Sequence, residues 1–333
     1  MRRQHGFVLP LALWILAAVA IAAGVFAERM MAALDLARLS QQRVQSLIDM
    51  SSTRAEILFR LGTTPMSVYG LGPAPGQAIA LDDRPYRGEG QDLLRLQDDR
   101  GLLNLNLAGE DSLHRLLGAL GVPYPRRNRL IDTFNDYIDE DDFKRLNGAE
   151  ARDYDAAGLT RPRNEKLVTP YDPINILGWR DFPQLWQNGG LPELAVTGTS
   201  VGLNPNTAPW QVLITLPGMT EETAKRIITL RRQTPIRLVD QVAAMIGVPA
   251  VNLMMQVITL PSDGIRLTQT APGQAWALRY NISLTPNGER VPWRMDYHYK
   301  IESPYPDVPL ESVPRLPEKS TLPANSGTPL SPF

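Results

Sequence analysis

Residues 7–27 read FVLPLALWILAAVAIAAGVFA, a run without a single charged side chain. About 20 apolar residues in a helix cross the hydrocarbon core of a bilayer, so this segment predicts a membrane-spanning helix. No small-x-small cleavage site ends it cleanly, which disfavours a removable secretory signal. The preceding leader, residues 1–6, carries Arg2 and Arg3. Because basic flanks remain cytoplasmic, we expect everything after Glu28 to lie on the far side of the membrane.

The helical pattern continues beyond the apolar run. Residues 28–61 contain no Pro or Gly, and apolar side chains recur every three or four positions. This spacing places them on one face of a helix. Gly62 and Pro65 follow and are typical of a helix end. Residues 7–61 together predict a rod of about 80 Å, at 1.5 Å per residue.

Two pairs of strands are predicted. Residues 92–97 and 102–106 flank a turn rich in Asp and Gly and read as a β-hairpin. Residues 276–284 and 291–301 flank Asn287-Gly288, a strong hairpin signal. Tight turns join antiparallel neighbours, so a small antiparallel sheet is expected.

Between these two pairs the pattern is helical, over residues 107–260. This order predicts an α+β fold, in which a long N-terminal helix lies on a small antiparallel sheet and a large all-α domain is inserted. Residues 63–90, rich in Pro and Gly, predict a loop. Residues 303–333 contain eight Pro and predict an extended or disordered tail. The predicted helices span residues 110–120, 126–138, 182–186, 209–216, 221–232 and 240–246.

One short pattern, L-N-x-N-x-A, occurs twice. It reads Leu103-Asn-Leu-Asn-Leu-Ala108 and again Leu203-Asn-Pro-Asn-Thr-Ala208. Each copy precedes a predicted helix, where Asn is a good N-cap because its side chain accepts from the free N–H groups of the first turn. Two interpretations stay open: two similar caps by coincidence, or two related helical hairpins packed as one domain.

An acidic run follows the second helix of the helical block. Carboxylates at this density suit Ca²⁺, which takes about six to eight oxygen ligands, although the spacing is not that of an EF-hand. Asp132, Asp136 and Asp139 would share one helix face, where a cation would relieve the repulsion between like charges. A solvated acidic surface is the alternative. The candidate ligands are Asp136, Asp139, Asp141, Asp142, Glu150 and Asp153.

Residues 216–227, LPGMTEETAKRI, look like a helix-hairpin-helix. DNA-binding versions present bare N–H groups of a Gly-x-Gly turn to a phosphate. Here Thr220 replaces the second Gly, and Glu221-Glu222 would repel a phosphate at that spot. The net charge of the chain is −1, so it offers no general counter-ion for nucleic acid. We expect no nucleic acid partner; a membrane-anchored DNA-uptake protein is kept as an alternative.

Catalytic motifs are missing from the sequence. There is no Cys, no H-E-x-x-H, no G-x-S-x-G and no Walker A sequence. We therefore expect a protein that is not an enzyme. A single-pass periplasmic metal-dependent enzyme is a further alternative and would need a pocket lined by the acidic run. An ordinary signal anchor whose Gly6 is never cut is the last alternative.

Taken in order, these features resemble the K minor pseudopilin of type II secretion systems, the general secretion pathway protein K family. The resemblance covers residues 6–301, and the order of its motifs is specific. It is carried by the Gly6-Phe7 junction after a basic leader, the Leu103-Asn-Leu-Asn106 turn, Asp136-Tyr-Ile-Asp139-Glu-Asp-Asp142, Gly148-Ala-Glu150, Asn204-Pro-Asn-Thr-Ala208 and the closing hairpin.

The resemblance implies cleavage after Gly6 by a prepilin peptidase and methylation of the new N-terminus, Phe7. It implies an inner-membrane anchor, a periplasmic C-terminal domain, and pseudopilins I and J as partners, with secreted cargo and the outer-membrane secretin as further candidates. It also implies calcium at the acidic run. Many relatives read Gly-Ala-Glu-Asp there, whereas Ala151 follows Glu150 in this chain, and Asp153 is a possible substitute ligand.

Most pilin-like subunits carry Glu at the fifth mature position, where this chain has Leu11. In the family that Glu is thought to pair with the N-terminal amine of a neighbouring subunit, a contact that a tip subunit does not need. The resemblance thus implies a tip subunit that promotes assembly of a periplasmic pseudopilus for export of folded proteins. The expected organisation is a prepilin leader (1–6), a transmembrane helix (7–27), a first pilin-like part (28–106), an inserted α domain (107–260), final pilin-like strands (261–302) and a Pro-rich tail (303–333).

Overall fold

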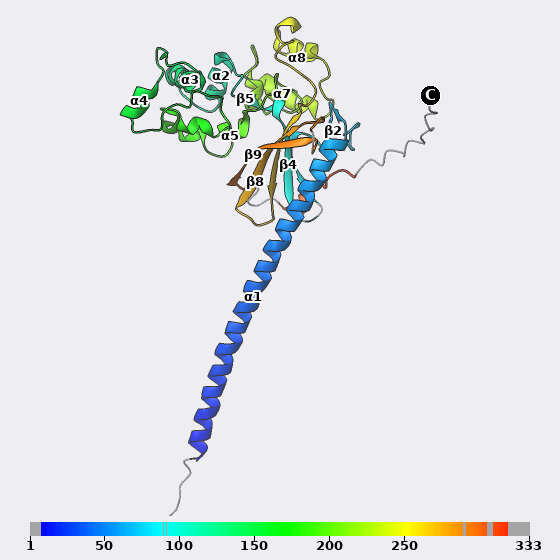
Figure 1. Cartoon of the computed structure of the whole chain (residues 1–333). Helices are drawn as coiled ribbons and strands as arrows, with labels where there is room; N and C mark the ends of the chain where they lie inside the picture. The colour runs from blue at the N-terminus through cyan, green and yellow to red at the C-terminus, as the bar shows by residue number, and fades with distance from the viewer. Residues whose placement is uncertain (1–7, 89, 91, 289–290, 305–308, 319–333) are drawn as a thin grey trace, which may run out of the picture.

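A single long helix, α1 (Val8–Thr63), projects from the rest of the molecule (Figure 1). Every residue from Val8 to Gln45 is exposed, including an apolar window long enough to cross a membrane. Side chains become buried from Met50 onward, at intervals of three or four residues, where α1 packs on a sheet. The predicted continuation of the helix past the apolar run is confirmed. The structure, a computed structural model, describes residues 8–88, 90, 92–288, 291–304 and 309–318.

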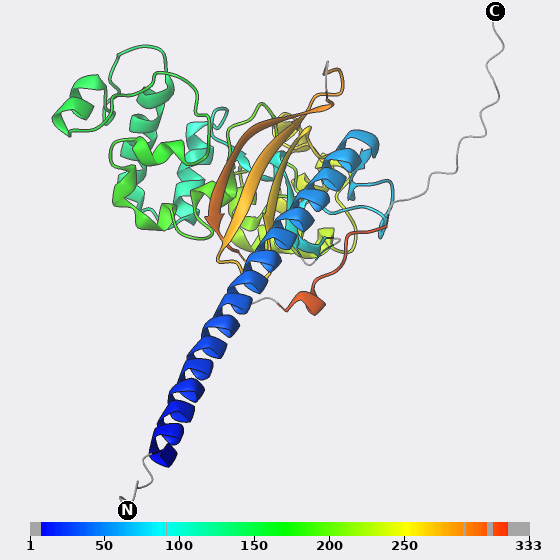
Figure 2. The same cartoon turned by 60° about the horizontal axis from the view of Figure 1, so that its bottom comes forward.

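A five-stranded antiparallel sheet lies against the end of α1 (Figure 2). Its register puts alternating apolar side chains of three strands on the face that meets the helix. Ile57 and Leu61 of α1 are buried against Leu96, Leu267 and Ile282, and each such side chain contributes about 1.5–3 kcal/mol of burial free energy. The strands, in sheet order, are β3 (Asp82–Arg87), β4 (Leu93–Asp98), β7 (Gly264–Thr270), β8 (Trp276–Leu284) and β9 (Trp293–Glu302).

The predicted hairpin of β8 with β9 is confirmed, but the predicted hairpin at residues 92–106 is wrong. β4 pairs with β3 and β7 instead. The side chain of Asp98 accepts the N–H two residues on and caps a 3-10 turn, η1 (Asp99–Gly101), so the chain leaves the sheet. The next strand, β5 (Leu103–Asn104), pairs in parallel with β6 (Ala195–Val196).

The predicted loop at residues 63–90 contains strands. β1 (Met66–Ser67) and β2 (Gly70–Leu71) form a small antiparallel pair, and β3 forms an edge of the main sheet. β3 reads DDRPYR and lacks an apolar alternation. Pro85 is tolerated there because an edge strand does not need every N–H for its ladder.

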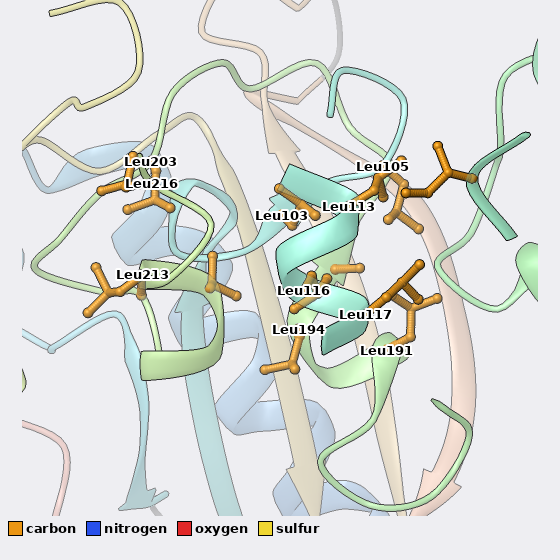
Figure 3. Close-up of a cluster of buried hydrophobic side chains, with 14 of the residues drawn as sticks. Leu103, Leu105, Leu113, Leu116, Leu117, Leu191, Leu194, Leu203, Leu213 and Leu216 are labelled. Carbon is orange, nitrogen blue, oxygen red and sulfur yellow. The ribbon is translucent and has the colours of Figure 1, made fainter. Parts of the chain in front are cut away.

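The inserted residues form a mainly helical body with its own hydrophobic core, and β6 is a short strand within it (Figure 1). Leu side chains from several segments far apart in the sequence meet in it (Figure 3). The predicted helices at 182–186 and 209–216 are shorter than expected: the first is a 3-10 turn, and the second holds one helical turn. No sequence pattern predicts α4 or α5. The bounds are α2 Glu110–Ala119, α3 Tyr124–Ile138, α4 Ala151–Ala156, η2 Asp172–Asn175, η3 Trp179–Asp181, η4 Pro183–Leu185, α5 Leu191–Leu194, α6 Trp210–Leu213, α7 Glu221–Arg231, α8 Val239–Ile246 and η5 Ala250–Asn252.

The start of the predicted Pro-rich tail is packed, contrary to the expectation of a disordered tail. A 3-10 turn, η6 (Leu310–Ser312), precedes Val313, which is buried against Leu93. The N–H of Arg87 donates to the carbonyl of Pro314 at 2.9 Å. The tail therefore pairs with the last residue of β3, at one end of an edge whose unpaired backbone groups would otherwise invite another strand. Residues 319–333 lie outside the described residues.

The second face of the sheet is polar and meets the α domain. Arg279 of β8 is fully buried and donates two hydrogen bonds to the carboxylate of Glu193 in α5, at 2.8 and 2.7 Å. Burial alone would raise the pKa of Glu193, but the Arg279 guanidinium more than offsets this and lowers it. Arg266 of β7 donates to the Glu193 carbonyl at 2.9 Å. These bonds attach the α domain to the sheet.

Replacing Glu193 with Ala should lower the unfolding free energy by about 3–5 kcal/mol, because it leaves Arg279 buried without a charged partner. The double variant Glu193→Ala with Arg279→Met should recover much of this loss, since it removes both charges. Denaturant unfolding measures both. Asp155→Ala, which breaks an exposed ion pair with Arg161, is the control and should barely move the midpoint. A double variant no more stable than Glu193→Ala would contradict the argument.

Candidate functional site

In the first L-N-x-N-x-A segment, the two Asn side chains have separate tasks. Asn104 Oδ1 accepts from the N–H of Asn106 at 3.1 Å and shapes the turn. Asn106 Nδ2 donates to the carbonyls of Leu167 and Thr197, both at 2.9 Å. Asn106 Oδ1 accepts from the N–H of Leu167 at 2.9 Å. One side chain therefore holds two distant segments, and we call this arrangement the Asn106 clasp.

The second copy of the pattern repeats the turn bond and the bonds of the clasp, although the amide of Asn104 donates to the carbonyls of Gly198 and Ser200 and that of Asn204 to the carboxylate of Asp98. Asn204 Oδ1 accepts from the N–H of Asn206 at 3.0 Å. Asn206 Nδ2 donates to the carbonyls of Ile236 and Thr259, at 2.8 and 3.0 Å, and its Oδ1 accepts from the N–H of Ile236 at 2.8 Å. This is the Asn206 clasp, and it matches the Asn106 clasp bond for bond.

The backbone beside each clasp repeats as well. Leu103 pairs in parallel with Ala195, and Leu203 pairs in parallel with Val257. A coincidence of two caps would not reproduce both side-chain and backbone bonds, so the geometry favours two related units within one domain. The expected capping role of the Asn residues is wrong, because α2 and α6 begin later and have Gly109 and Pro209 at their N-caps.

The two units differ between their second helix and the segment that the clasp holds. In the second unit α7 ends at Arg231, and Ile236 follows within a few residues. In the first unit α3 ends at Ile138, and Leu167 comes only after residues 139–166. Most of the acidic run lies in this extra segment. The candidate site is thus an insertion into one of two related units.

Two carboxylates of α3 fold the insertion back onto the helix. Asp136 is fully buried and accepts from the N–H of Arg145, at 3.3 and 3.2 Å to its two oxygens. Burial raises its pKa. Asp132 accepts from the N–H and the side-chain amide of Asn147, at 3.1 and 2.9 Å. A side chain at Gly148 would overlap the Asp136 carboxylate, so glycine there allows the close approach.

Glu150 is the most unusual group of the acidic run. It is 8% exposed, and neither of its carboxylate oxygens has a hydrogen-bond donor among the described residues. Burial, followed by the nearby charges of Asp136, Asp139 and Asp142, raises its pKa to about 7. Asp139 Oδ1 is also buried without a described donor, and burial raises the pKa of Asp139. Such orphaned acceptors are costly.

The other predicted ligands have partners of their own. Asp153 receives Lys144 Nζ at 2.8 Å and the N–H of Glu150 at 2.9 Å. The hydrogen bond from Lys144 is the main reason that its pKa is lowered. Asp141 accepts from the backbone at 2.9 Å, and Asp142 receives a long bond of 3.4 Å from Asn164. Both carboxylate oxygens of Asp153 thus already accept a hydrogen bond from within the chain.

The carboxylate oxygens of the acidic run are of the chemical type that binds a cation. Within the described part of the chain, no three His, Asp or Glu side chains stand close enough to hold a metal ion. The orphaned oxygens of Glu150 and Asp139 are nevertheless the hard donors that calcium takes. A cation there would also reduce the repulsion that raises the Glu150 pKa.

Several polar side chains of the helix-hairpin-helix-like segment and of α7 have partners within the domain. Thr220 caps α7 by accepting from the N–H of Thr223 at 3.2 Å. Lys225 forms an ion pair with Glu221, and Arg231 donates to two backbone carbonyls at 2.8 and 2.6 Å. These contacts indicate that the segment stabilises the packing of the domain.

The predicted processing residues, Gly6 and Phe7, lie outside the described residues. Leu11, at the fifth position after Gly6, lies on the exposed surface of α1.

Comparison with known proteins identifies the family of this chain. Two family models, both described as type II secretion system (T2SS) protein K, match residues 92–179 and 203–260. The chain belongs to the protein K family of type II secretion systems. The two matches fall on the two clasp-bearing units, and the first also takes in β4. Comparison with curated protein sequences finds no match.

Among solved structures, the chain is similar to one described as "The Crystal Structure of the GspK-GspI-GspJ complex from enterotoxigenic Escherichia coli Type 2 Secretion System". The sequence identity is 19%, and the TM-score is 0.56. The match covers 80% of this chain and 99% of the other. At this identity the likeness concerns the fold, and it agrees with a minor pseudopilin of mixed α+β architecture.

Removing either clasp should destabilise the α domain to a similar degree. Asn106→Ala and Asn206→Ala each leave three backbone groups without their side-chain partner, at a cost of about 2–4 kcal/mol in unfolding free energy. Asn135→Ala, which loses only an exposed bond to Glu110, is the control. Chemical denaturation of the three variants measures the difference. Clasp variants as stable as the control would show that the clasps are not structural.

The raised pKa of Glu150 predicts a pH dependence in the absence of divalent cations. Between about pH 4.5 and 7 the folded chain keeps a proton on Glu150 that the unfolded chain has released. Stability should therefore fall as the pH rises through this window. Glu150→Gln should flatten this part of the curve, whereas Glu165→Gln, an exposed residue of the same insertion, should not. Thermal unfolding in chelator at several pH values measures it, and identical curves for wild type and Glu150→Gln would disprove it.

Proposed function

We propose that this chain forms the tip of a periplasmic pseudopilus together with the minor pseudopilins I and J, and promotes its assembly for export of folded proteins. The observation that supports this most is the shape of the molecule. The bulky α domain and the sheet sit at one end of α1, and the remainder of the helix is bare (Figure 1). A bare apolar helix needs lipid or other helices to cover it.

The anchor and its processing form part of the proposal. The apolar half of α1 would hold the precursor in the inner membrane as a single span, with the remaining chain in the periplasm. A prepilin peptidase would cut after Gly6, and Phe7 would be methylated. The helix would then leave the membrane and pack against the helices of I and J.

The tip position rests on two features. Leu11 cannot form the contact that a Glu at this position makes with the subunit above. The α domain adds bulk beyond the sheet, at the end away from the bare half of α1 (Figure 1), which would block further growth. Secreted cargo and the outer-membrane secretin would meet this exposed domain. The family is a structural component of a secretion system, and we propose no catalytic role.

We also propose calcium as a ligand of the acidic run. Glu150 and Asp139 would supply the orphaned oxygens, with Asp136, Asp141 and Asp142 beside them. The ion would supply positive charge to a group of carboxylates that burial and mutual repulsion disfavour. Asp153 would act by capping α4 and holding the Glu150 backbone.

The route through the membrane is tested by the mature N-terminus. Mass spectrometry of the chain from cells with an active prepilin peptidase should find methylated Phe7 at its start. Gly6→Val should leave Met1 or its leader in place and abolish secretion of the exported proteins. Gly109→Ala is the control, because Gly109 lies outside α1 and a side chain there meets nothing within 4 Å. An intact leader in wild type would contradict the proposed processing.

The tip position is tested by gold labels on the α domain, which should mark one end of each filament. Labels along the filament sides would contradict the tip position.

A further inference from the structure

A cleft of about 640 Å³ lies near the C-terminal end of α1, away from the bare part of that helix (Figure 1). Its walls come from the turn between β1 and β2, from β3, from the segment after α7 and from the start of the C-terminal tail. Arg60, near the end of α1, holds the tail there by donating to the carbonyl of Pro317 at 2.7 Å. The cleft is therefore bounded by the sheet, the α domain and the tail together. Its volume lies within the range of ligand pockets, about 300–1,000 Å³.

Positive charge dominates the lining of this cleft. The described residues that line it include five Arg side chains but a single acidic one, Asp82. That carboxylate is already engaged, because Arg84 donates to both of its oxygens at 2.7 Å. Four guanidinium groups therefore have no carboxylate partner within the described lining. They belong to Arg231, Arg232, Arg237 and Arg315.

Two of these four guanidinium groups are held in place by the chain, and two are free. Arg237 donates to the hydroxyl of Tyr69 at 2.8 Å, and Arg231 donates to two backbone carbonyls. Arg232 and Arg315 are exposed, and their side chains form no hydrogen bond or ion pair with any described residue. The cleft thus has a fixed positive lining and two Arg side chains available to a ligand.

Arg231 shows that the lining is short of negative charge. Its Nε is buried and has no acceptor among the described residues. Burial is the main reason that its pKa is lowered to about 10; the attraction of Asp82 opposes this, while the repulsion of Arg84 and Arg232 adds to it. Three guanidinium groups are therefore near enough to repel one another. An anion in the cleft would offset that repulsion.

A series of carboxylates fits this lining better than a single small anion. Guanidinium groups bind carboxylates through two parallel hydrogen bonds, and these groups reach the cleft from α7, from the segment after it and from the tail. One inorganic ion would leave several of them unpaired. Tyr69, Tyr86 and five Pro residues also line the cleft. Their rings give apolar surface to the rest of a peptide chain.

Three other anionic or local occupants fit less well. Proteins that bind single-stranded nucleic acid use a basic groove that follows the strand, whereas this cleft is a confined pocket in a chain of net charge −1. Lipid head groups would be met at the apolar half of α1, and the cleft lies at the other end of that helix (Figure 1). Residues 319–333, which continue the tail, contain Lys319 and no Asp or Glu.

We propose that this cleft binds an acidic segment of a partner protein, with Arg232 and Arg315 pairing with its carboxylates. Arg231 and Arg237 add positive charge from fixed positions. Because the walls belong to the sheet, the α domain and the tail, a bound segment would contact all three. The surface is separate from the acidic run, and it depends neither on calcium nor on the proposed tip position.

The test uses the full chain in detergent micelles and a short fluorescent peptide in which Glu alternates with Ala. Fluorescence anisotropy should show binding with a Kd of about 10⁻⁵ M in low salt. Affinity should fall at least about tenfold at roughly 0.5 M salt, because salt screens exposed charges. A peptide with Gln in place of every Glu should show no binding at the same concentrations.

Substitution of the two free Arg residues locates the binding surface. Arg232→Gln and Arg315→Gln should each weaken binding about fivefold, and the double variant about twentyfold or more. The melting temperature should not change, since neither side chain has a partner among the described residues. Arg226→Gln is the matched control: Arg226 is an exposed Arg of α7 outside the lining of the cleft, and its loss should leave the affinity unchanged.

Several results would overturn the proposal. Equal affinity for the Gln peptide, or unchanged affinity of the double variant, would show that the two Arg residues do not bind carboxylates. Displacement of the peptide by micromolar inorganic phosphate would indicate a site for a small ion. Tighter binding of single-stranded DNA than of the Glu peptide would indicate a nucleic acid partner. A rise in affinity of more than about tenfold on removal of residues 319–333 would identify the end of this chain as the occupant.

Discussion

The packing of the last turns of α1 on one face of the sheet is the contact on which the rest of the structure depends. Ile57 and Leu61 share a core with β4, β7 and β8, and this core fixes the sheet to the helix. From Val8 to Gln45 every residue of the same helix is exposed. One continuous helix therefore has a part that the chain itself covers and a part that lipid or other subunits must cover.

The sequence correctly predicted the elements that depend on neighbouring residues alone. α1 follows from a long stretch with few Gly or Pro residues, and the β8–β9 hairpin follows from Asn287-Gly288 between two strands. The wrong predictions concern which strand pairs with which. β4 pairs with a strand before it and with β7, more than a hundred and fifty residues later, and β5 pairs with β6. Spacing along the chain holds no information on such distant pairing.

The candidate site divides in the same way. The density of carboxylates after α3 could be seen in the sequence, and so could the repeated L-N-x-N-x-A pattern. Which carboxylates face inward could not. Glu150 is left without a donor while Asp153, three residues later, pairs with Lys144. That difference arises because the insertion folds back onto Asp136 through backbone N–H groups and Gly148, a tertiary arrangement that no spacing encodes.

The attachment of the α domain explains how a bulky insertion can have a defined place at the end of a rod. The domain meets the sheet through buried polar groups, chiefly Arg279 with Glu193 and Arg266 with the backbone of α5. A buried bidentate ion pair is satisfied only in one register. The sheet is in turn fixed to α1 by its apolar face. The α domain is therefore held in a fixed orientation on the sheet, and the sheet on α1. As a result, the direction of α1 determines the direction in which the α domain points.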